Sequence, residues 1–283
     1  MTILLIDADL VAYRCAASVA EDAPLDFAVA RCDRLMHELL HVTQCDHYCG
    51  YLTGGDNFRK TINKEYKANR KDMVPPKWLQ QCREFLIKEW KCKLAIGCEA
   101  DDLLGINQDK STHTTIIASL DKDLMMIPGK HYNWMHDTHA IGDRMEGIKT
   151  FYKQMLIGDV SDNVIGVAGI GKVKAAKRID PLTTEQEMIE VVFDLYKEDA
   201  ARFYMNAQCL WILQNEGETW AKRVDNSILP DLLKQELEAM SDSMISLMEN
   251  TSTEHIMIPT TMFGTPANGI VVESMEAETV PLT

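Results

Sequence analysis

The sequence predicts an α/β fold, in which a mainly parallel, twisted sheet is flanked by helices and followed by a helical region. Three observations lead to this prediction. Short apolar runs of strand length alternate with segments of helical spacing over the first two-thirds of the chain. Two of these runs end on an aspartate, and beyond about residue 150 the patterns are helical. Strands that alternate with helices are typical of a mainly parallel sheet.

The first strand and helix come near the start of the chain. Residues 3–6 (Ile-Leu-Leu-Ile) form an apolar run that ends abruptly at Asp7, as a buried strand does. The helix that follows has apolar residues at helical spacing, namely Ala28, Cys32, Leu35, Leu39 and Val42. A second strand is predicted at residues 48–52 and stops at the Thr-Gly-Gly-Asp sequence of residues 53–56.

A second helix and a third strand complete the predicted sheet region. Residues 78–90 place Leu79, Cys82 and Leu86 on one face of a helix. Residues 114–120 favour a strand, which ends on Asp121. Because ligands of parallel α/β sheets gather at the carboxyl ends of the strands, strands that end on aspartate predict a site at that edge.

The later part of the chain is predicted to be helical. Thr184 and Glu187 have the spacing of a capping box, and another helix is predicted over residues 203–211. We therefore divide the chain into an α/β core at residues 1–150, a helical region at 151–240 and a weakly ordered acidic tail at 241–283.

Composition excludes several classes of protein. The chain has 283 residues, 46% of them hydrophobic, which is enough for a substantial core. No stretch is apolar for long enough to cross a bilayer, and Asp7 and Asp9 interrupt the N-terminal apolar run, which argues against a signal peptide. We expect a cytoplasmic protein. The net charge of −14 decides little about a nucleic-acid partner, because much of the acid lies in the tail and in the clusters described next.

The eight cysteines include no CxxC pair and are expected to be buried apolar residues. The zinc grouping that we considered consists of His41, Cys45, His47 and Cys49. The strand pattern from His47 onwards would place His47 and Cys49 on one face but leave Cys45 outside it. The sequence therefore does not favour a zinc site.

Four acidic groupings mark the predicted carboxyl edge of the sheet. They are Asp7; Glu99, Asp101 and Asp102; Asp121 and Asp123; and Asp159 and Asp162. On a helix Glu99 and Asp102 would share one side, and Asp159 and Asp162 have the same spacing. Each grouping alone is explained as a helix cap or a solvated loop. Together they would repel one another unless cations held them. Such hard oxygen ligands indicate two Mg²⁺ ions, with Mn²⁺ as a substitute. Two such ions about 3.5–4 Å apart activate water in phosphodiester hydrolysis.

The densest positive run lies at residues 59–71 and ends before Pro75-Pro76. A charge run is often only a solvated helix face, but here Tyr66 offers a surface on which a base can stack. Lys67 and Arg70 are spaced so that one helix face could present both to a scissile phosphate. The other predicted DNA-binding residues of the run are Arg59, Lys60, Lys64 and Lys71.

A glycine hairpin at residues 166–171 (Gly-Val-Ala-Gly-Ile-Gly) is the second candidate for phosphate binding. Glycines before a helix start let backbone N–H groups approach a phosphate closely. An ordinary turn would also explain them, but four cations follow at once. The predicted DNA-binding residues are Gly169, Gly171, Lys172, Lys174 and Lys177, with Arg178 beside them.

The order of these motifs resembles the 5′-nuclease (flap endonuclease) family. It runs from Asp7 through Asp56, Tyr-Lys-Ala-Asn-Arg, Glu-Ala-Asp-Asp, Asp-Lys-Asp and Gly-Asp-Val-Ser-Asp-Asn to the glycine hairpin. The likeness covers roughly residues 3–180. It is greatest to the bacteriophage 5′→3′ exonucleases and to the 5′-nuclease domain of bacterial DNA polymerase I. The resemblance implies a PIN-like fold with a basic arch at residues 56–77 and a helix-turn-helix variant that grips duplex DNA.

The resemblance also implies roles for single residues. The first metal ion would be held or surrounded by Asp7, Asp56, Glu99, Asp101 and Asp102. The second would be served by Asp121, Asp123, Asp159 and Asp162. Lys67 and Arg70 would approach the scissile phosphate from the arch, and the carbonyls of Val167 and Ile170 would bind K⁺. Asp9 is an additional acid, and the tail has no counterpart in the family.

The function implied is a structure-selective 5′→3′ exonuclease and flap endonuclease that uses two metal ions in phage DNA replication or recombination. Its substrates would be DNA with 5′ ends, flaps or nicks, and RNA in RNA–DNA hybrids. One alternative is a PIN-like ribonuclease, against which the duplex-binding hairpin argues. A non-catalytic DNA-binding scaffold with the same fold is another, against which the complete acid set argues.

Overall fold

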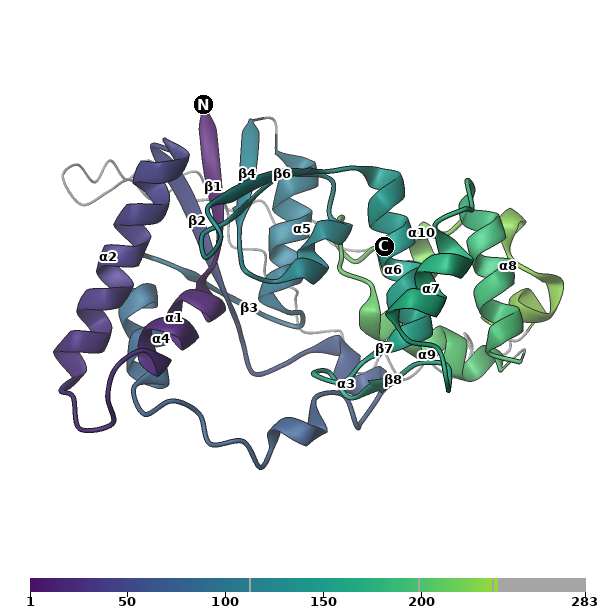
Figure 1. The fold of residues 1–283 in the computed structure, drawn as a ribbon, viewed down its shortest axis with the longest axis horizontal. Coiled ribbons are helices and arrows are strands. Elements are labelled where there is room, and N and C mark those ends of the chain that lie inside the picture. The colour runs from purple at the N-terminus through teal and green to yellow at the C-terminus, as the bar shows by residue number, and fades with distance from the viewer. Residues whose placement is uncertain (112, 198, 236, 239–283) are drawn as a thin grey trace.

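A central sheet organises the computed structural model, which describes residues 1–111, 113–197, 199–235 and 237–238 (Figure 1). Six strands form this sheet in the described residues, in the order β3-β2-β1-β4-β5-β6. All neighbouring strands are parallel except β5 and β6, which are antiparallel. The strands are β1 (Thr2–Asp7), β2 (His47–Thr53), β3 (Lys93–Ala95), β4 (Thr114–Ala118), β5 (Gly129–Asn133) and β6 (Thr138–Gly142). The predicted parallel sheet and its three strands are confirmed. The tail predicted at residues 241–283 lies outside the described residues.

Strand β1 shows why its sequence is continuously apolar. Ile3 and Leu5 pack into the core on one face of the sheet, whereas Leu4 and Ile6 pack into the core on the other. A strand that is buried on both faces needs apolar residues at every position. Since β1 lies parallel between β2 and β4, the carboxyl ends of all three strands meet at one edge.

Three helices cover one face of the sheet (Figure 1). They are α1 (Ala8–Ala17), α2 (Leu25–Thr43) and α4 (Leu79–Lys88). The helices predicted from residue 28 to 42 and over residues 78–90 are confirmed in α2 and α4.

The opposite face is covered by α5 (Ala100–Lys110) and α6 (Arg144–Ile157). The chain continues into a short hairpin and four further helices, which lie on the right of Figure 1. These are β7 (Gly158–Asp159), β8 (Val164–Ile165), α7 (Lys172–Ile179), α8 (Glu185–Leu195), α9 (Ala200–Leu210) and α10 (Trp220–Arg223). The capping box of Thr184 and Glu187 is present at the start of α8, as predicted.

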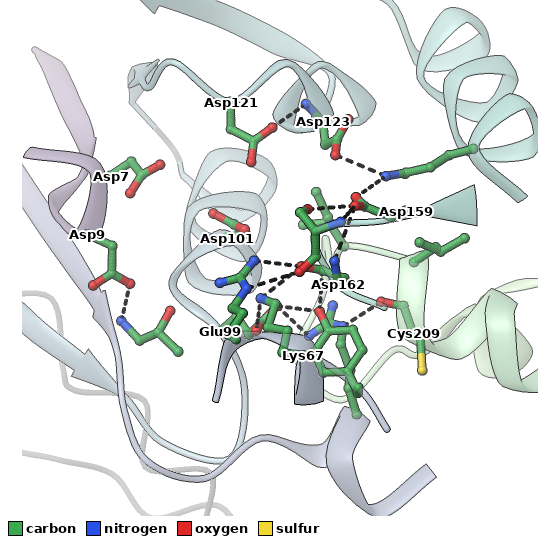
Figure 2. A pocket seen from close by; sticks show the side chains of 18 of the residues that line it. Asp7, Asp9, Lys67, Glu99, Asp101, Asp121, Asp123, Asp159, Asp162 and Cys209 are labelled. Atoms are coloured by element: carbon green, nitrogen blue, oxygen red, sulfur yellow. Dashed lines mark hydrogen bonds and ion pairs between the residues drawn. The ribbon is translucent and has the colours of Figure 1, made fainter. Parts of the chain in front are cut away.

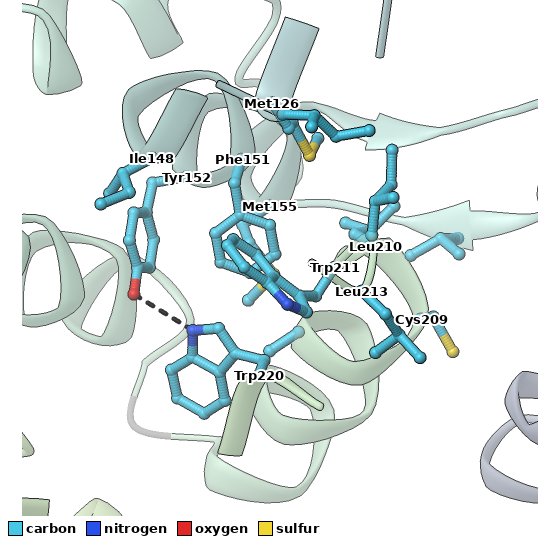
Figure 3. Close-up of a cluster of buried hydrophobic side chains, with 14 of the residues drawn as sticks. Met126, Ile148, Phe151, Tyr152, Met155, Cys209, Leu210, Trp211, Leu213 and Trp220 are labelled. Carbon is cyan, nitrogen blue, oxygen red and sulfur yellow. Dashed lines mark hydrogen bonds between the residues drawn. The ribbon is translucent and has the colours of Figure 1, made fainter. Parts of the chain in front are cut away.

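Helix α6 joins the sheet region to the later helices through one continuous core. Phe151 lies edge-on to Trp211, and the Trp220 indole donates a 3.2 Å hydrogen bond to the Tyr152 hydroxyl (Figure 3). The boundary predicted at residue 150 lies inside α6, so it does not coincide with a linker.

The segment between β2 and α4 is a long connection near the carboxyl edge of the sheet (Figure 1). It contains the short helix α3 (Phe58–Ile62) and the 3-10 turn η1 (Ala68–Arg70). Two further 3-10 turns are η2 (Lys122–Met126) and η3 (Asn226–Ile228). None of the helices within the described residues is long and apolar enough to span a membrane.

Candidate active site

Seven of the predicted acids line one pocket at the carboxyl edge of the sheet (Figure 2). They come from β1, from the start of α5, from the turn after β4 and from the β7–β8 hairpin, and are Asp7, Glu99, Asp101, Asp121, Asp123, Asp159 and Asp162. Lys67 and Arg70 line the same pocket. The fold therefore brings together side chains that are up to 155 positions apart in sequence, from Asp7 to Asp162.

Asp7, Asp101 and Asp121 form one acidic group in the pocket. Within the described residues, none of the three takes part in a salt bridge. Burial raises the pKa of Asp7 to about 6, although the Ser119 hydroxyl donates a 2.7 Å hydrogen bond to its Oδ2. Burial, with the charges of Asp7, Asp121 and Glu99, raises the pKa of Asp101 well above its usual value. This cluster carries negative charge that a cation would relieve.

Gln154 links Asp123 and Asp159, a role that no sequence motif indicates. Its Nε2 donates to Asp123 Oδ2 at 3.0 Å and to Asp159 Oδ2 at 3.1 Å. Burial raises the pKa of Asp123 to about 6. Burial also acts on Asp159, but hydrogen bonds from the Ser161 hydroxyl and backbone outweigh it and lower that pKa.

Local geometry differs from the predicted helical spacing in both acid pairs. Glu99 is the extended N-cap of α5 and Asp102 lies inside the helix, so the two share a capping box rather than one helix face. Asp159 lies in β7, and Asp162 follows in the turn toward β8. Glu99 and Asp102 therefore meet in the cap of α5, and Asp159 and Asp162 lie in a hairpin and not on a helix.

Lys67 and Arg70 contact acids of the pocket directly. The Lys67 ammonium pairs with Glu99 Oε1 and lies 3.6 Å from Asp162 Oδ1. Arg70 Nη2 donates to Asp162 Oδ1 at 2.8 Å. Although burial acts to raise it, the charges of Arg59 and Lys67 lower the pKa of Glu99.

Tyr66 does not offer a stacking surface, because it is only 3% exposed. Its hydroxyl lies 2.9 Å from Glu99 Oε2 and 2.7 Å from Asp162 Oδ2, so it joins the two acids. The prediction that Tyr66 stacks on a base is therefore wrong, since the apolar ring fills the core beneath the pocket.

Arg59 and Asp102 form a buried ion pair. The predictions that Arg59 contacts DNA and that Asp102 binds a metal ion are therefore wrong. Their side chains are 2% and 0% exposed, and their two hydrogen bonds measure 2.6 and 2.7 Å. Asp102 does not line the pocket. Because both charged groups are buried, each needs a partner of opposite charge, and the two side chains supply this to each other.

Asp56 is exposed and lies outside the pocket, so the metal role implied for it is not supported by its position. Asp9 does line the pocket. It pairs with Arg83 and accepts a 2.7 Å hydrogen bond from the Thr53 N–H. Asp9 thus ties α1 to the end of β2 and to α4.

The glycine hairpin precedes α7, whose cations point outward. Lys172, Lys174, Lys177 and Arg178 are exposed, as are Lys60, Lys64 and Lys71 of the arch segment. Gly169 has a φ of 76°, which glycine adopts without strain. The carbonyl of Gly169 accepts a 2.8 Å hydrogen bond from Lys174, and that of Val167 accepts one of 3.1 Å from the Ile170 N–H. Contacts of these residues with DNA, and of Val167 and Ile170 with K⁺, stay predictions.

The donor types of the pocket fit a hard divalent cation. The acids without a cationic partner supply carboxylate oxygens, which suit Mg²⁺ or Mn²⁺ rather than zinc. Within the described residues, no three His, Cys, Asp or Glu side chains are arranged so that they could hold a metal ion as they stand. Binding would therefore require side-chain movement.

Comparison with known proteins places the chain among nucleases. Residues 2–155 match the family model described as the N-terminal resolvase-like domain of the 5′-3′ exonucleases. Over 162 residues the chain is 30% identical to DNA polymerase I of Caldicellulosiruptor bescii, covering 48% of this chain and 18% of that protein. Over 130 residues it is 33% identical to a 5′-3′ exonuclease of Buchnera aphidicola, covering 41% and 45%. The chain thus spans less than half the length of these relatives.

The fold is similar to that of the bacteriophage T5 flap endonuclease, solved as a pseudo-enzyme-product complex with DNA and metal ions. The TM-score is 0.57 at 16% identity, and the match covers 86% of this chain and all of the T5 chain. This likeness confirms the predicted fold.

Proposed function

This chain belongs to the 5′-3′ exonuclease family, and on that premise we propose that it is a metal-dependent 5′→3′ exonuclease and flap endonuclease. One observation carries the proposal: seven acids from separate segments line a single pocket together with Lys67 and Arg70. Carboxylates serve hard dications, and the two basic side chains suit a phosphate whose negative charge grows during hydrolysis.

The cofactor proposed is a pair of Mg²⁺ ions. Asp7, Asp101 and Asp121 would hold one of them, and Asp123 and Asp159 the other. When bound, the ions supply an activated water and stabilise the leaving oxygen. Glu99 and Asp162, which now pair with Lys67 and Arg70, would become available to the ions once those cations move to phosphate.

The residues of the chain itself orient the substrate. Lys67 and Arg70 would meet the negative charge on the scissile phosphate. Tyr66 keeps Glu99 and Asp162 in place through its hydroxyl. Apolar residues of α9 and the segment after it, Leu210 and Ile212, close one side of the pocket.

The substrate proposed is duplex DNA with a 5′ end, flap or nick, and RNA in RNA–DNA hybrids. The exposed cations of α7 and the hairpin before it support duplex binding without sequence preference. K⁺ at the hairpin carbonyls of Val167 and Ile170 is part of this proposal. A role in phage DNA replication or recombination, in the host cytoplasm, is part of the same proposal.

The test uses a 5′-labelled flap substrate with Mg²⁺ and with EDTA. We expect release of labelled product with Mg²⁺ only, and greater release from flapped DNA than from single-stranded RNA. Efficient cleavage of single-stranded RNA alone would favour a PIN-like ribonuclease. DNA binding without any metal-dependent release would favour a scaffold and refute the proposal.

Asp101→Asn supplies the matched variant. The substitution removes a carboxylate donor and also relieves the repulsion from Asp7, Asp121 and Glu99, so it should abolish release while it raises the melting temperature measured in EDTA. Loss of both activity and folding would instead show that Asp101 is structural.

A further inference from the structure

A basic segment and an acidic loop lie against each other beside the pocket. The basic segment is residues 65–70 of the arch, and the acidic loop is residues 159–163 between β7 and β8. Lys67 donates its backbone N–H to the carbonyl of Asp162 at 2.9 Å. The two segments are about 95 residues apart in the chain, so this contact is tertiary and not part of a local turn.

Two asparagines hold these segments together at both ends of the contact. Asn69 Nδ2 donates to the carbonyl of Val160 at 2.7 Å. From the other side, Asn163 Nδ2 donates to the carbonyl of Glu65 at 2.8 Å. Both contacts join an uncharged amide to a backbone oxygen, so neither uses a group that phosphate or a metal ion would compete for.

The charged contacts between the same segments are of a different kind. Lys67 and Arg70 reach the carboxylate of Asp162, and Lys67 also pairs with Glu99. A phosphate competes for both cations and a metal ion competes for both acids. Charged contacts can therefore exchange when substrate binds, whereas the two asparagine contacts can persist.

The backbone of Lys67 makes such support necessary. Its φ is 57°, in the left-handed region that residues with a side chain rarely adopt. Residues in such conformations persist only where surrounding contacts hold them. Asn163 has a similar φ of 58°, which asparagine tolerates better than most residues.

We propose that Asn69 and Asn163 are positioning residues that hold the basic segment on the acidic loop. They keep the backbone of Lys67 in its left-handed conformation while its ammonium group exchanges carboxylates for the scissile phosphate. The catalytic part of this inference rests on the proposed function. The structural part, that the two amides hold Lys67, does not.

The kinetic test uses Asn69→Ala and Asn163→Gly, because glycine keeps the left-handed backbone and removes only the amide. Gln186→Ala is the control, since its exposed amide contacts Glu190 on α8, away from the pocket. Displacement of a catalytic group by about 1 Å can cost about 100-fold in rate. We expect kcat on flap DNA to fall about 10- to 100-fold in both variants, KM to change less than about threefold, and the control to match the unmodified protein.

A double-variant measurement separates positioning from a general effect. In a Lys67→Ala background, Asn163→Gly should lower kcat no further, because the group that it positions is gone. An unchanged kcat in the single variants, or an equal additional loss in the Lys67→Ala background, would overturn the inference.

Hydrogen exchange of the Lys67 amide gives a readout without DNA or metal. Both variants should lose protection at this amide while the amides of α2 keep theirs. Retained protection would overturn the inference. If the unmodified protein released no labelled product, the proposed function would fail, and this exchange measurement would decide the inference by itself.

Discussion

Replacing Arg59 by methionine should destabilise the protein strongly without changing its contacts with DNA. The guanidinium makes two hydrogen bonds to Asp102, and one each to the carbonyls of Cys209 and Trp211, at 2.6–2.9 Å. Methionine keeps most of the stem volume but leaves the carboxylate of Asp102 buried and unpaired. The two backbone carbonyls would lose their donor as well.

The size of the effect follows from burial. Removing one partner of a buried ion pair costs about 3–5 kcal/mol. A protein of this size loses about 2–4 °C in melting temperature for each kcal/mol, so Arg59→Met should lower it by roughly 6–20 °C. The control is Arg34→Met, which breaks the exposed pair with Glu38 on α2, where the arginine side chain is 79% exposed. Exposed pairs of this spacing contribute only about 0.3–0.5 kcal/mol.

Urea unfolding followed by tryptophan fluorescence and thermal melting would measure both variants. The salt dependence of DNA binding, measured below the melting temperature, should be unchanged in Arg59→Met because the Arg59 side chain is only 2% exposed and is paired with Asp102. A loss of stability as small as that of Arg34→Met, or a weaker salt dependence, would refute the assignment of Arg59 to the core.

Three further predictions concern the pocket. Lys67→Ala should lower kcat on flap DNA by about 10²–10³-fold, because one preorganised charge is lost. Affinity, measured in a binding assay, should fall less. A loss of affinity alone would show that Lys67 only helps to bind DNA. Asp56→Asn should leave Mg²⁺-dependent release unchanged because Asp56 lies outside the pocket, whereas Asp121→Asn should reduce it. In EDTA the melting temperature should fall as pH rises from about 4 to about 6. Folding raises the pKa values of Asp7 and Asp123 from 3.8 to about 6. Their contribution to stability is therefore complete when the pH is below the pKa of the unfolded state and is lost as the pH rises through the pKa of the folded state. Asparagine at both positions should flatten this dependence, and an unaltered profile would contradict it.

Several site residues could be predicted because their signals are local. A buried strand that ends on an acid, as at Asp7 and Asp121, places that acid at the carboxyl edge wherever the strand lies in a parallel sheet. The positions of Lys67 and Arg70 followed from family motifs. Gln154 and Ser119 carry no such signal, because a single polar residue on a helix or after a strand has many uses.

The wrong predictions share a physical cause. Arg59, Tyr66 and Asp102 were assigned by charge or chemistry, but Arg59 and Tyr66 bond to partners 33 to 152 positions away in the chain, Asp102 among them. Whether a charged group lies in solvent or in a buried pair depends on those distant segments. A sequence pattern records which residue types are near one another along the chain and not which neighbours enclose them.

The sequence by itself indicated three parallel strands, the helices α2 and α4 and the edge at which the acids gather, because periodicity and strand ends are properties of short segments. It did not indicate β3, β5, β6 or α1. Only the tertiary structure decided which charged residues line the pocket and which form buried ion pairs in the core. The fold divides the acids into those like Asp101, whose pKa is raised by burial and by neighbouring acids, and those like Asp102, neutralised by an arginine from another segment. That division depends on how the segments pack in space, since the cost of a buried charge is set by the groups that surround it.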